Sequence, residues 1–379
     1  MKLRHDAIDI QKFDAICAQQ TALADYPNAS AVESNLLLYQ ARTLRAALEQ
    51  PKRLQLQQEL VKAFTTGPGV VIIKGFYPDL AVIDEHNQLL DALFSLESDR
   101  QAADHFAKAG ANGRIWNSLQ KAALHSPRAF INYYKNPLFS LIAEAWLGPH
   151  YQMTAQVNVV RPGGQAQSPH RDYHLGFQDK AVLGDYPPHV HQLSPQLTLQ
   201  GGVAHTEMPI ESGPTLYLPF SQQYEEGYLA WRDEAFKEYF ADNFVQIAIE
   251  KGDAIFFNPA LFHAAGSNHT ADFHRIANLF QLSSAFGRAM ESVDREAMCL
   301  AIYSELLEQT TSLSSQELAA ILNNTAEGYS FPTNLDTDPP LAGMAPKTQK
   351  QLMRLALKEQ WSLADFRKQL QMHSKRRLA

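Results

Sequence analysis

Cysteine is scarce in this chain of 379 residues, which contains only Cys17 and Cys299. They lie far apart and outside any C-x-x-C pattern, which argues against a disulfide scaffold and against a structural zinc site. No apolar run approaches the roughly 18 residues of a membrane span, and the first residues, MKLRHDAIDIQKFDAI, contain no signal-peptide core. We therefore expect a protein of a reducing compartment, the cytoplasm, with no membrane partner.

Positive charge is also in short supply. The formal net charge is −7, and no basic run occurs before Lys375-Arg376-Arg377, so we expect no nucleic-acid partner. The ending Arg377-Leu378-Ala379 does not match the S-K-L address of peroxisomal proteins. With 45% hydrophobic residues, the chain is long enough to fold without a metal or a disulfide, so a metal here would serve chemistry.

No internal repeat or low-complexity linker breaks the chain, and we predict three parts. Residues 1–57 form an N-terminal helical extension, because apolar residues from Val32 to Phe64 recur at helical intervals that are interrupted at Pro51. Residues 58–285 form the core, and residues 286–379 form a C-terminal helical region packed on it. Helices of this kind commonly serve packing or dimerisation, so a homodimer through the helical extensions is one expectation.

The core combines strands with helices. A buried strand is predicted from Val70 to Ile73, and helical spacing follows from Leu80 to Leu96. Short strands separated by Pro and Gly clusters then dominate from Tyr151 to Ser284. This pattern predicts an α+β fold whose core is a double-stranded β-helix, a cupin-like jelly roll with flanking N- and C-terminal helices, and whose two sheets open around a pocket.

The most informative pattern is His170-x-Asp172, followed by His263 after 93 residues. The first two ligands stand two residues apart, so on an extended segment both side chains point the same way and can bind one ion. A predicted turn at Lys251-Gly252-Asp253 and a buried strand would bring His263 nearby. Two imidazoles and one carboxylate leave positions open on a metal, as in non-haem iron enzymes. An isolated H-x-D triplet can equally be a surface pair or a turn.

Arg275 follows His263 by 12 residues, on the next predicted strand. Arginine offers a planar fork of donors for a carboxylate. The co-substrate 2-oxoglutarate chelates iron through its keto-acid end and needs a cation for its distal carboxylate. The ordered set of two histidines, one aspartate and one arginine therefore indicates an iron site that uses 2-oxoglutarate.

Five segments carry a resemblance to one family: ELVKAFTTGPGVVIIKGFYPD, NPLFSLIAEAWLGPHYQMTAQVNVVRPGG, SPHRDYHLGF, ESGPTLYLPFSQQ and HAAGSNHTADFHR. Together they resemble the phytanoyl-CoA dioxygenase family of Fe(II)/2-oxoglutarate oxygenases, over roughly positions 58 to 285. The third segment is similar to the family's iron-binding segment, and the last to its run from distal histidine to arginine. The resemblance implies that His170, Asp172 and His263 are the catalytic iron ligands, with Fe(II), 2-oxoglutarate and dioxygen as cofactor and co-substrates.

The chain departs from the family pattern at several positions. The interval from His263 to Arg275 is one residue longer than usual, and His274 stands at the expected offset of the arginine. Either Arg275 or a neighbour would therefore hold the co-substrate carboxylate. Phe220 stands where the family has glycine, and Gln222 stands where it has histidine, which implies a differently lined co-substrate pocket.

Residues around these motifs are candidates for binding. Ser267 and Asn268 are expected to support the co-substrate site through hydrogen bonds, and a plain turn is the alternative. Five further residues are candidates for lining the substrate pocket: Tyr173, His174, Phe177, Gln156 and Asn158. For the aromatic residues the alternative is simple filling of the barrel, and for His174 it is a structural hydrogen bond.

By resemblance, the chain is a non-haem Fe(II)/2-oxoglutarate-dependent dioxygenase that hydroxylates a C–H bond of a small-molecule substrate and releases succinate and CO2. Asp172 favours hydroxylation, because related halogenases replace this carboxylate with a small residue. Two alternatives stay open. One is a cupin-like metalloenzyme that does not use 2-oxoglutarate and so forms no succinate, and the other is a catalytically silent jelly-roll binding protein.

Overall fold

The computed structural model describes residues 8–96, 112–330, 334–341 and 343–378. Its central sheet is mostly antiparallel and has eight strands within these residues. In spatial order they are β1 (Ala31–Glu33), β2 (Leu36–Gln40), β3 (Val70–Lys74), β8 (Ala254–Phe257), β6 (Thr198–Ala204), β10 (Arg275–Ser283), β5 (Gln152–Val160) and β4 (Asn112–Ile115).

A second, smaller sheet pairs β7 (Leu216–Leu218) with β9 (Phe262–Ala264). Two single bridges widen this layer, one joining His170 to His263 and the other joining Tyr217 to Val245. Residues of both sheets line one cavity between them. Two β-layers that enclose a pocket are typical of the cupin-like double-stranded β-helix, and the predicted fold class is confirmed.

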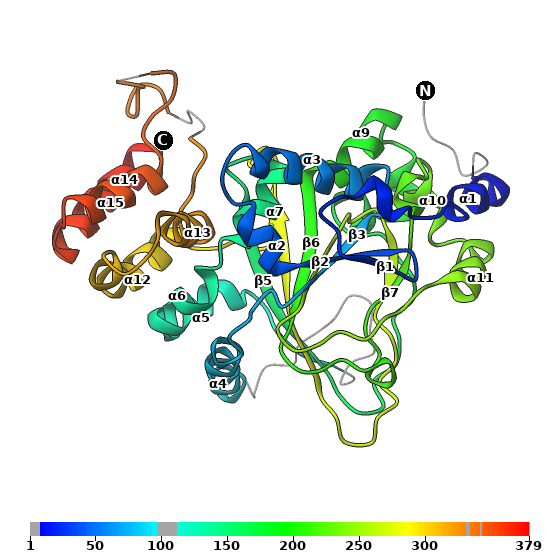
Figure 1. The fold of residues 1–379 in the computed structure, drawn as a ribbon. Coiled ribbons are helices and arrows are strands. Elements are labelled where there is room, and N and C mark those ends of the chain that lie inside the picture. Colours follow the sequence, from blue (N-terminus) through cyan, green and yellow to red (C-terminus); the bar gives the residue numbers. More distant parts are fainter. Residues whose placement is uncertain (1–7, 97–111, 331–333, 342, 379) are drawn as a thin grey trace.

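Helices surround the central sheet (Figure 1). Their bounds are α1 (Ile10–Cys17), α2 (Ala41–Ala46), α3 (Lys52–Thr65), α4 (Ala81–Leu96), α5 (Ser118–His125), α6 (Pro127–Tyr134), α7 (Leu138–Leu147), α8 (Lys180–Leu183), α9 (Pro188–Leu193), α10 (Gly227–Ala230), α11 (Glu234–Asn243), α12 (Arg295–Gln309), α13 (Ser315–Thr325), α14 (Gln349–Lys358) and α15 (Leu363–Arg376). The C-terminal helices gather on one side of the sheet with α4 to α6, whereas α1 and α11 lie on the opposite side (Figure 1).

Alternation along the strands separates two environments. On β5, Met153 and Val157 point toward the helices and join the main apolar core. Gln156 and Asn158 point to the other face and line the cavity. Because successive strand residues face opposite ways, one strand can serve both the core and the site.

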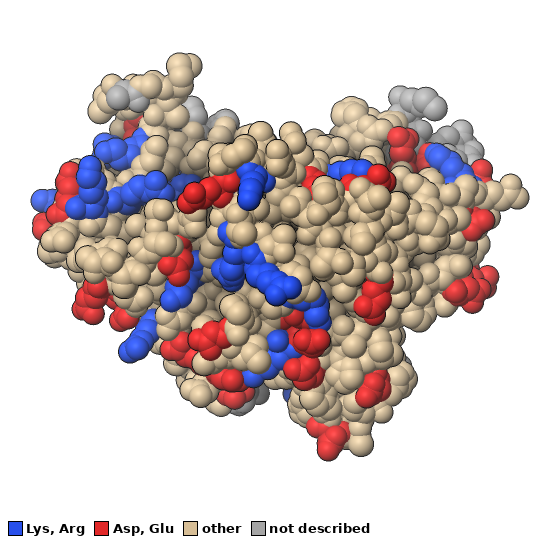
Figure 2. Space-filling model, viewed as in Figure 1, with Lys and Arg blue, Asp and Glu red and all other residues tan. Residues whose placement is uncertain are grey.

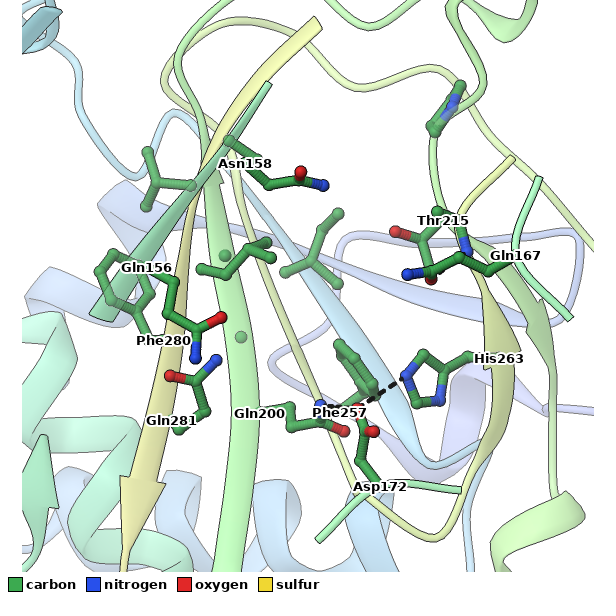
Figure 3. Close-up of a pocket in the computed structure, with 18 of the residues that line it drawn as sticks. Gln156, Asn158, Gln167, Asp172, Gln200, Thr215, Phe257, His263, Phe280 and Gln281 are labelled. Carbon is green, nitrogen blue, oxygen red and sulfur yellow. Dashed lines mark hydrogen bonds and ion pairs between the residues drawn. The ribbon is translucent and has the colours of Figure 1, made fainter. Parts of the chain in front are cut away.

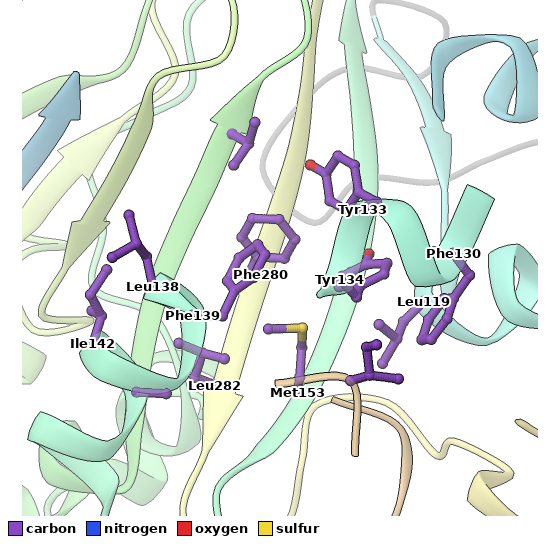
Figure 4. Packing of buried hydrophobic residues seen from close by; sticks show 14 of the residues in the cluster. Leu119, Phe130, Tyr133, Tyr134, Leu138, Phe139, Ile142, Met153, Phe280 and Leu282 are labelled. Carbon is purple, nitrogen blue, oxygen red and sulfur yellow. The ribbon is translucent and has the colours of Figure 1, made fainter. Parts of the chain in front are cut away.

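Aromatic and branched apolar side chains fill the core on the helix side (Figure 4). Phe139 of α7 meets Phe280 of β10 edge to face at 4.9 Å between ring centroids, and it meets Phe76 at 5.0 Å. All three side chains are fully buried. Burial of each such side chain stabilises the fold by about 1.5–3 kcal/mol, so this core holds the helices against the strands that position the site.

Helices α12 and α13 contact the core. Leu306 of α12 and Leu322 of α13 belong to the main apolar core. Polar ties reinforce the contact: the Arg295 Nη2 donates to the Met153 carbonyl at 2.8 Å, and the Asn324 Nδ2 donates to the Tyr134 carbonyl at 3.0 Å. The apolar faces of these helices are therefore used within the chain itself.

The N-terminal part is not wholly helical, and the prediction of a helical extension over residues 1–57 is wrong for residues 31–40. Leu36–Gln40 is a strand that pairs in parallel with β3, with Leu37 opposite Val71. Leu36 and Leu37 are both fully buried. Periodicity cannot distinguish such a short apolar run from a buried helix, and tertiary pairing decides the outcome. The division of the chain into three parts stays a prediction.

Charged side chains of both signs occur on the surface. On the face seen in Figure 2, acidic and basic side chains are interspersed. Within the described residues, no helix has the length and apolar character needed to cross a membrane.

Replacing Phe139 by alanine should lower the free energy of unfolding by about 3–5 kcal/mol, because a buried aromatic ring is lost and a cavity remains. Phe286, which is 78% exposed, provides the matched control, and Phe286→Ala should change stability by less than about 0.5 kcal/mol. Urea unfolding followed by circular dichroism measures both values. Equal unfolding midpoints for the two variants would contradict the assigned core.

Candidate metal centre

The site begins with two chain segments that pair side by side. The His170 amide donates to the His263 carbonyl at 3.0 Å, and the His263 amide donates back to the His170 carbonyl at 3.3 Å. The Asp172 amide donates to the Pro259 carbonyl at 3.0 Å. The segment before Asp172 is thus extended and attached to β9, although it is not itself a regular strand.

This pairing gathers the side chains of His170, Asp172 and His263. One ligand atom from each lies within 4.8 Å of the others, and all three residues are buried. The His170 Nε2 is 3.6 Å from the Asp172 Oδ1, and the His263 Nε2 is 3.3 Å from the Asp172 Oδ2. Neighbouring ligand atoms that each lie about 2.1 Å from one metal ion are separated by about 3 Å, so the three groups are close to ligand spacing.

Both imidazoles are oriented by backbone carbonyls. The His170 Nδ1 lies 2.8 Å from the Ser168 carbonyl oxygen, and the His263 Nδ1 lies 2.9 Å from that of Leu261. Since a carbonyl only accepts, each Nδ1 carries a proton and donates it, which turns each Nε2 toward Asp172 and makes it the atom that can bind a metal. The ring of Phe257 packs on His263 edge to face, at 4.8 Å between centroids.

The Asp172 carboxylate is held in its ionised form. Burial alone raises the pKa of this carboxyl, but His170, His263 and Gln200 outweigh burial and lower it to about 2. The Gln200 Nε2 donates directly to the Asp172 Oδ2. Gln200 was not among the residues expected from the sequence, because no local motif marks a cross-strand partner of a ligand.

Arg171, between the two ligands of the motif, points away from the cavity and is 2% exposed. Its Nη2 donates to the carbonyls of Ser221 and Tyr224 at 2.6 and 2.9 Å. Its guanidinium lies 5.2 Å from the ring centroids of Tyr228 and Phe262. Burial lowers the pKa of Arg171 to about 10, so it stays charged at neutral pH and fixes the ligand segment from behind.

Arg275 opens β10 and lines the same cavity as the three ligands. It is 5% exposed, and its Nη1 has no hydrogen-bond partner within the described part of the chain. Burial lowers the pKa of Arg275 to about 10, with Tyr217 opposing the shift, and the side chain therefore remains a cation. His274, the neighbour considered from the sequence, is exposed. The structure thus places Arg275, and not His274, in the cavity.

The cavity encloses about 1120 Å³ including its open mouth. Four of the five residues expected to contact substrate line it: Gln156, Asn158, Tyr173 and Phe177. The fifth, His174, is half-buried and does not line it. Figure 3 shows amide side chains from neighbouring strands converging on this space, among them Gln156, Gln200 and Gln281.

Ser267 and Asn268 do not line the cavity either. The Ser267 Oγ accepts from the Ala166 amide at 2.9 Å, and the Asn268 side chain bonds Val160, Thr270 and Phe273. These bonds shape the loop between β9 and β10, so the structure supports the turn alternative for both residues and not a direct contact with the co-substrate.

The structure also shows what Phe220 and Gln222 do at the two positions where the family has glycine and histidine. Phe220 adopts a left-handed backbone conformation with φ of 68°, which is the region that glycine favours. The Gln222 Nε2 donates to the carbonyls of Thr65 and Gly67 at 3.2 and 2.8 Å. Gln222 therefore ties this strand end to α3 and does not line the cavity.

The fold and the three converging ligands define a cupin-like protein with a two-histidine, one-carboxylate metal centre. The family model described as "Phytanoyl-CoA dioxygenase (PhyH)" matches residues 66–277, more than half of the chain. The chain therefore belongs to the phytanoyl-CoA dioxygenase family of non-haem Fe(II)/2-oxoglutarate-dependent dioxygenases, and the family resemblance seen in the sequence is confirmed.

Two relatives carry the name dioxygenase. "Dioxygenase trt7" of Aspergillus terreus is 31% identical over 144 residues, which are 37% of this chain and 45% of that protein. "Dioxygenase andF" of Emericella variicolor is 22% identical over 214 residues, which are 55% of this chain and 67% of that protein. The chain thus spans less than half of the first relative and about two thirds of the second.

Two solved structures are similar over most of their own length. The non-haem α-ketoglutarate-dependent carbocyclase SnoK from nogalamycin biosynthesis is 19% identical with a TM-score of 0.47, covering 62% of this chain and 86% of that chain. The epimerase SnoN from the same biosynthesis is 18% identical with a TM-score of 0.42, covering 61% and 84%. Both likenesses are too distant to bear on the reaction of this chain.

The residues present fit Fe(II) and 2-oxoglutarate. Two neutral imidazole nitrogens and one ionised carboxylate form the donor set that non-haem iron prefers. The buried Nη1 of Arg275, without a partner in the described chain, suits a carboxylate in the same cavity.

Substitution of Gly227 can show whether Arg171 stabilises the segment that holds the metal ligands. A Cβ at this position would collide with the Arg171 guanidinium, which cannot move aside because it is buried and bonded to two carbonyls. Gly227→Ala should therefore lower stability by about 1–3 kcal/mol and weaken Fe(II) binding, although alanine favours the helix in which Gly227 lies.

The control for this substitution is Gly287→Ala, because a Cβ there meets only ordinary contacts of 3.8 Å with His174 and Leu197. Thermal unfolding and an anaerobic Fe(II) titration of both variants supply the readout. If Gly227→Ala and Gly287→Ala bind Fe(II) equally well, Arg171 has no supporting role at the site.

Proposed function

We propose that this protein is an Fe(II)/2-oxoglutarate-dependent dioxygenase that hydroxylates a C–H bond of a small molecule. The observation that carries the proposal is the buried Arg275, whose Nη1 lacks a partner among the described residues, in one cavity with His170, Asp172 and His263. A buried guanidinium with an unpartnered Nη1 in the same cavity as a metal centre suits an anion, and the distal carboxylate of 2-oxoglutarate would supply the missing acceptor.

In this proposal His170 and His263 bind Fe(II) through their Nε2 atoms, and Asp172 binds it through its carboxylate. Arg275 holds the distal carboxylate of 2-oxoglutarate. When bound, iron supplies the activation of dioxygen that is coupled to the conversion of 2-oxoglutarate into succinate and CO2.

Residues of the chain itself orient the imidazole ligands and line the cavity around them. The carbonyls of Ser168 and Leu261 set both imidazole tautomers before metal arrives. Phe257 covers His263 on one side. Gln156 and Asn158 face the space where a substrate would lie, and Tyr173 and the 42% exposed Phe177 also line the cavity. We assign substrate contact to these four residues.

Two further expectations stay predictions. A homodimer through the helical extensions is testable by light scattering of the purified protein, although α12 and α13 already bury apolar residues against their own core. Location in the cytoplasm is testable by cell fractionation.

The first experiment on this function is an anaerobic titration with Fe(II) and 2-oxoglutarate, monitored by the weak visible charge-transfer band of the chelate. His170→Ala should abolish the band because an iron ligand is lost. Arg275→Ala should weaken 2-oxoglutarate binding by about 10- to 150-fold, the range for a lost hydrogen bond to a charged group. Arg275→Lys should bind 2-oxoglutarate more weakly than the unmodified protein but more tightly than Arg275→Ala, since lysine keeps the charge but lacks the planar fork.

Matched controls are His189→Ala and Arg42→Ala, because both side chains are exposed and lie outside the cavity. They should titrate like the unmodified protein. Absence of the band in intact, iron-loaded protein would refute the use of 2-oxoglutarate and favour a cupin-like metalloenzyme of another type, and failure to bind Fe(II) would favour a silent binding protein.

Hydroxylation itself makes a separate prediction. With any compound that raises succinate formation above the uncoupled rate, the reaction under ¹⁸O₂ should place one labelled oxygen atom in the product for each succinate formed. Mass spectrometry of product and succinate gives this ratio. Succinate formed together with an oxidised but unlabelled product would show that the enzyme oxidises C–H bonds without hydroxylating them.

A further inference from the structure

We propose that Gln200 is a positioning residue that makes Asp172 offer the metal a single carboxylate oxygen. The inference rests on the proposed iron and 2-oxoglutarate function. Gln200 lies on β6, is 8% exposed and faces the cavity. Its Nε2 donates to the Asp172 Oδ2, as Figure 3 shows, which leaves the Oδ1 without a bond from this amide.

The orientation of the Gln200 amide is dictated by chemistry. An ionised carboxylate can only accept hydrogen bonds, so the amide must turn its NH₂ group toward Asp172. Its carbonyl oxygen Oε1 is then buried without a partner within the described residues. An unsatisfied buried acceptor costs free energy. If this side chain only filled space, an apolar residue could do so without that cost. The unsatisfied acceptor lies next to the metal ligands, and unfavourable local features of this kind are expected at functional sites.

Both ends of the contact are anchored. β6 lies between β8 and β10, and Gln200 stands opposite Phe257 on one side and Gln281 on the other. The Asp172 amide donates to the Pro259 carbonyl at 3.0 Å, and the Asp172 carbonyl accepts from the Tyr228 hydroxyl at 3.3 Å. Because neither backbone is free to shift, the amide and the carboxylate meet in one arrangement.

Occupying the Oδ2 matters because positions on iron are limited. With one atom from each of His170, Asp172 and His263, three positions of an octahedral ion stay open. The keto-acid end of 2-oxoglutarate would take two of them, which would leave the third for dioxygen. If Asp172 bound through both oxygens, one of these positions would be lost. A neutral donor on the Oδ2 opposes that second bond without adding charge to the site.

The test uses Fe(II) alone and then 2-oxoglutarate, both without oxygen, on the full chain. In Gln200→Leu, which removes the donor, Asp172 becomes free to bind iron through both oxygens. Fe(II) affinity should stay within about threefold of the unmodified protein or rise, whereas 2-oxoglutarate affinity, followed by the charge-transfer band, should fall at least about tenfold. Gln200→Met keeps the unbranched shape of the side chain, also lacks the donor, and should show the same selective loss.

Gln281→Leu is the matched control, since Gln281 is an amide in the same cross-strand row but bonds Thr154 and no metal ligand. Thermal unfolding establishes that each variant is folded, and the Met variant keeps the test available if the Leu variant is not. A 2-oxoglutarate affinity equal to that of the control would overturn the proposal. Loss of Fe(II) and 2-oxoglutarate affinity together in a folded variant would also overturn it, as a sign of general structural damage.

The two proposals fail in different ways. Absence of the band in the unmodified protein would refute the iron and 2-oxoglutarate function, and with it the assigned role of Gln200. A normal band in the unmodified protein that is unchanged in both Gln200 variants refutes only the positioning role.

Discussion

The reciprocal backbone hydrogen bonds between His170 and His263 are the constraint on which the rest of the site depends. They join two segments that lie 93 residues apart and extend the second sheet by one bridge. Because backbone pairing sets which way each side chain faces, a slip of one residue would turn a ligand out of the cavity. The large sheet and its helices therefore keep this short bridge in register. Arg171 stabilises the same segment from the side away from the cavity.

Much of this site could be predicted from the sequence, because its signals are local. The two-residue step from His170 to Asp172 suffices to place both side chains together on an extended segment. The choice between His274 and Arg275 required the structure, since adjacent strand residues face opposite ways and only the register of β10 decides which enters the cavity. Gln200 left no trace in the sequence because its role comes from a contact across strands. The strand at Leu36–Gln40 was misread for a related reason, namely that its pairing partner lies beyond any local window.

Two buried arginines show how similar residues acquire opposite roles. Arg171 and Arg275 are 2% and 5% exposed, and burial lowers the pKa of each to about 10. Arg171 donates hydrogen bonds to two carbonyls and is flanked by aromatic rings, so its charge stabilises the fold. Arg275 has an Nη1 without a partner in the described chain and lies open to the cavity. The distinction rests on what each guanidinium faces, which is backbone carbonyls for Arg171 and the cavity for Arg275.

The parallel pairing of β2 with β3 has a consequence for how this protein can be handled. The family match begins at residue 66, after β2 and α3. A fragment cut at that point would leave β3, with its sequence Val-Val-Ile-Ile-Lys, as an uncovered edge with unpaired amides and carbonyls. Such an edge is a template for adding strands from other molecules, so the cut fragment would aggregate by edge-to-edge association. The boundary of the family match is thus not a boundary at which the edge of the sheet is covered.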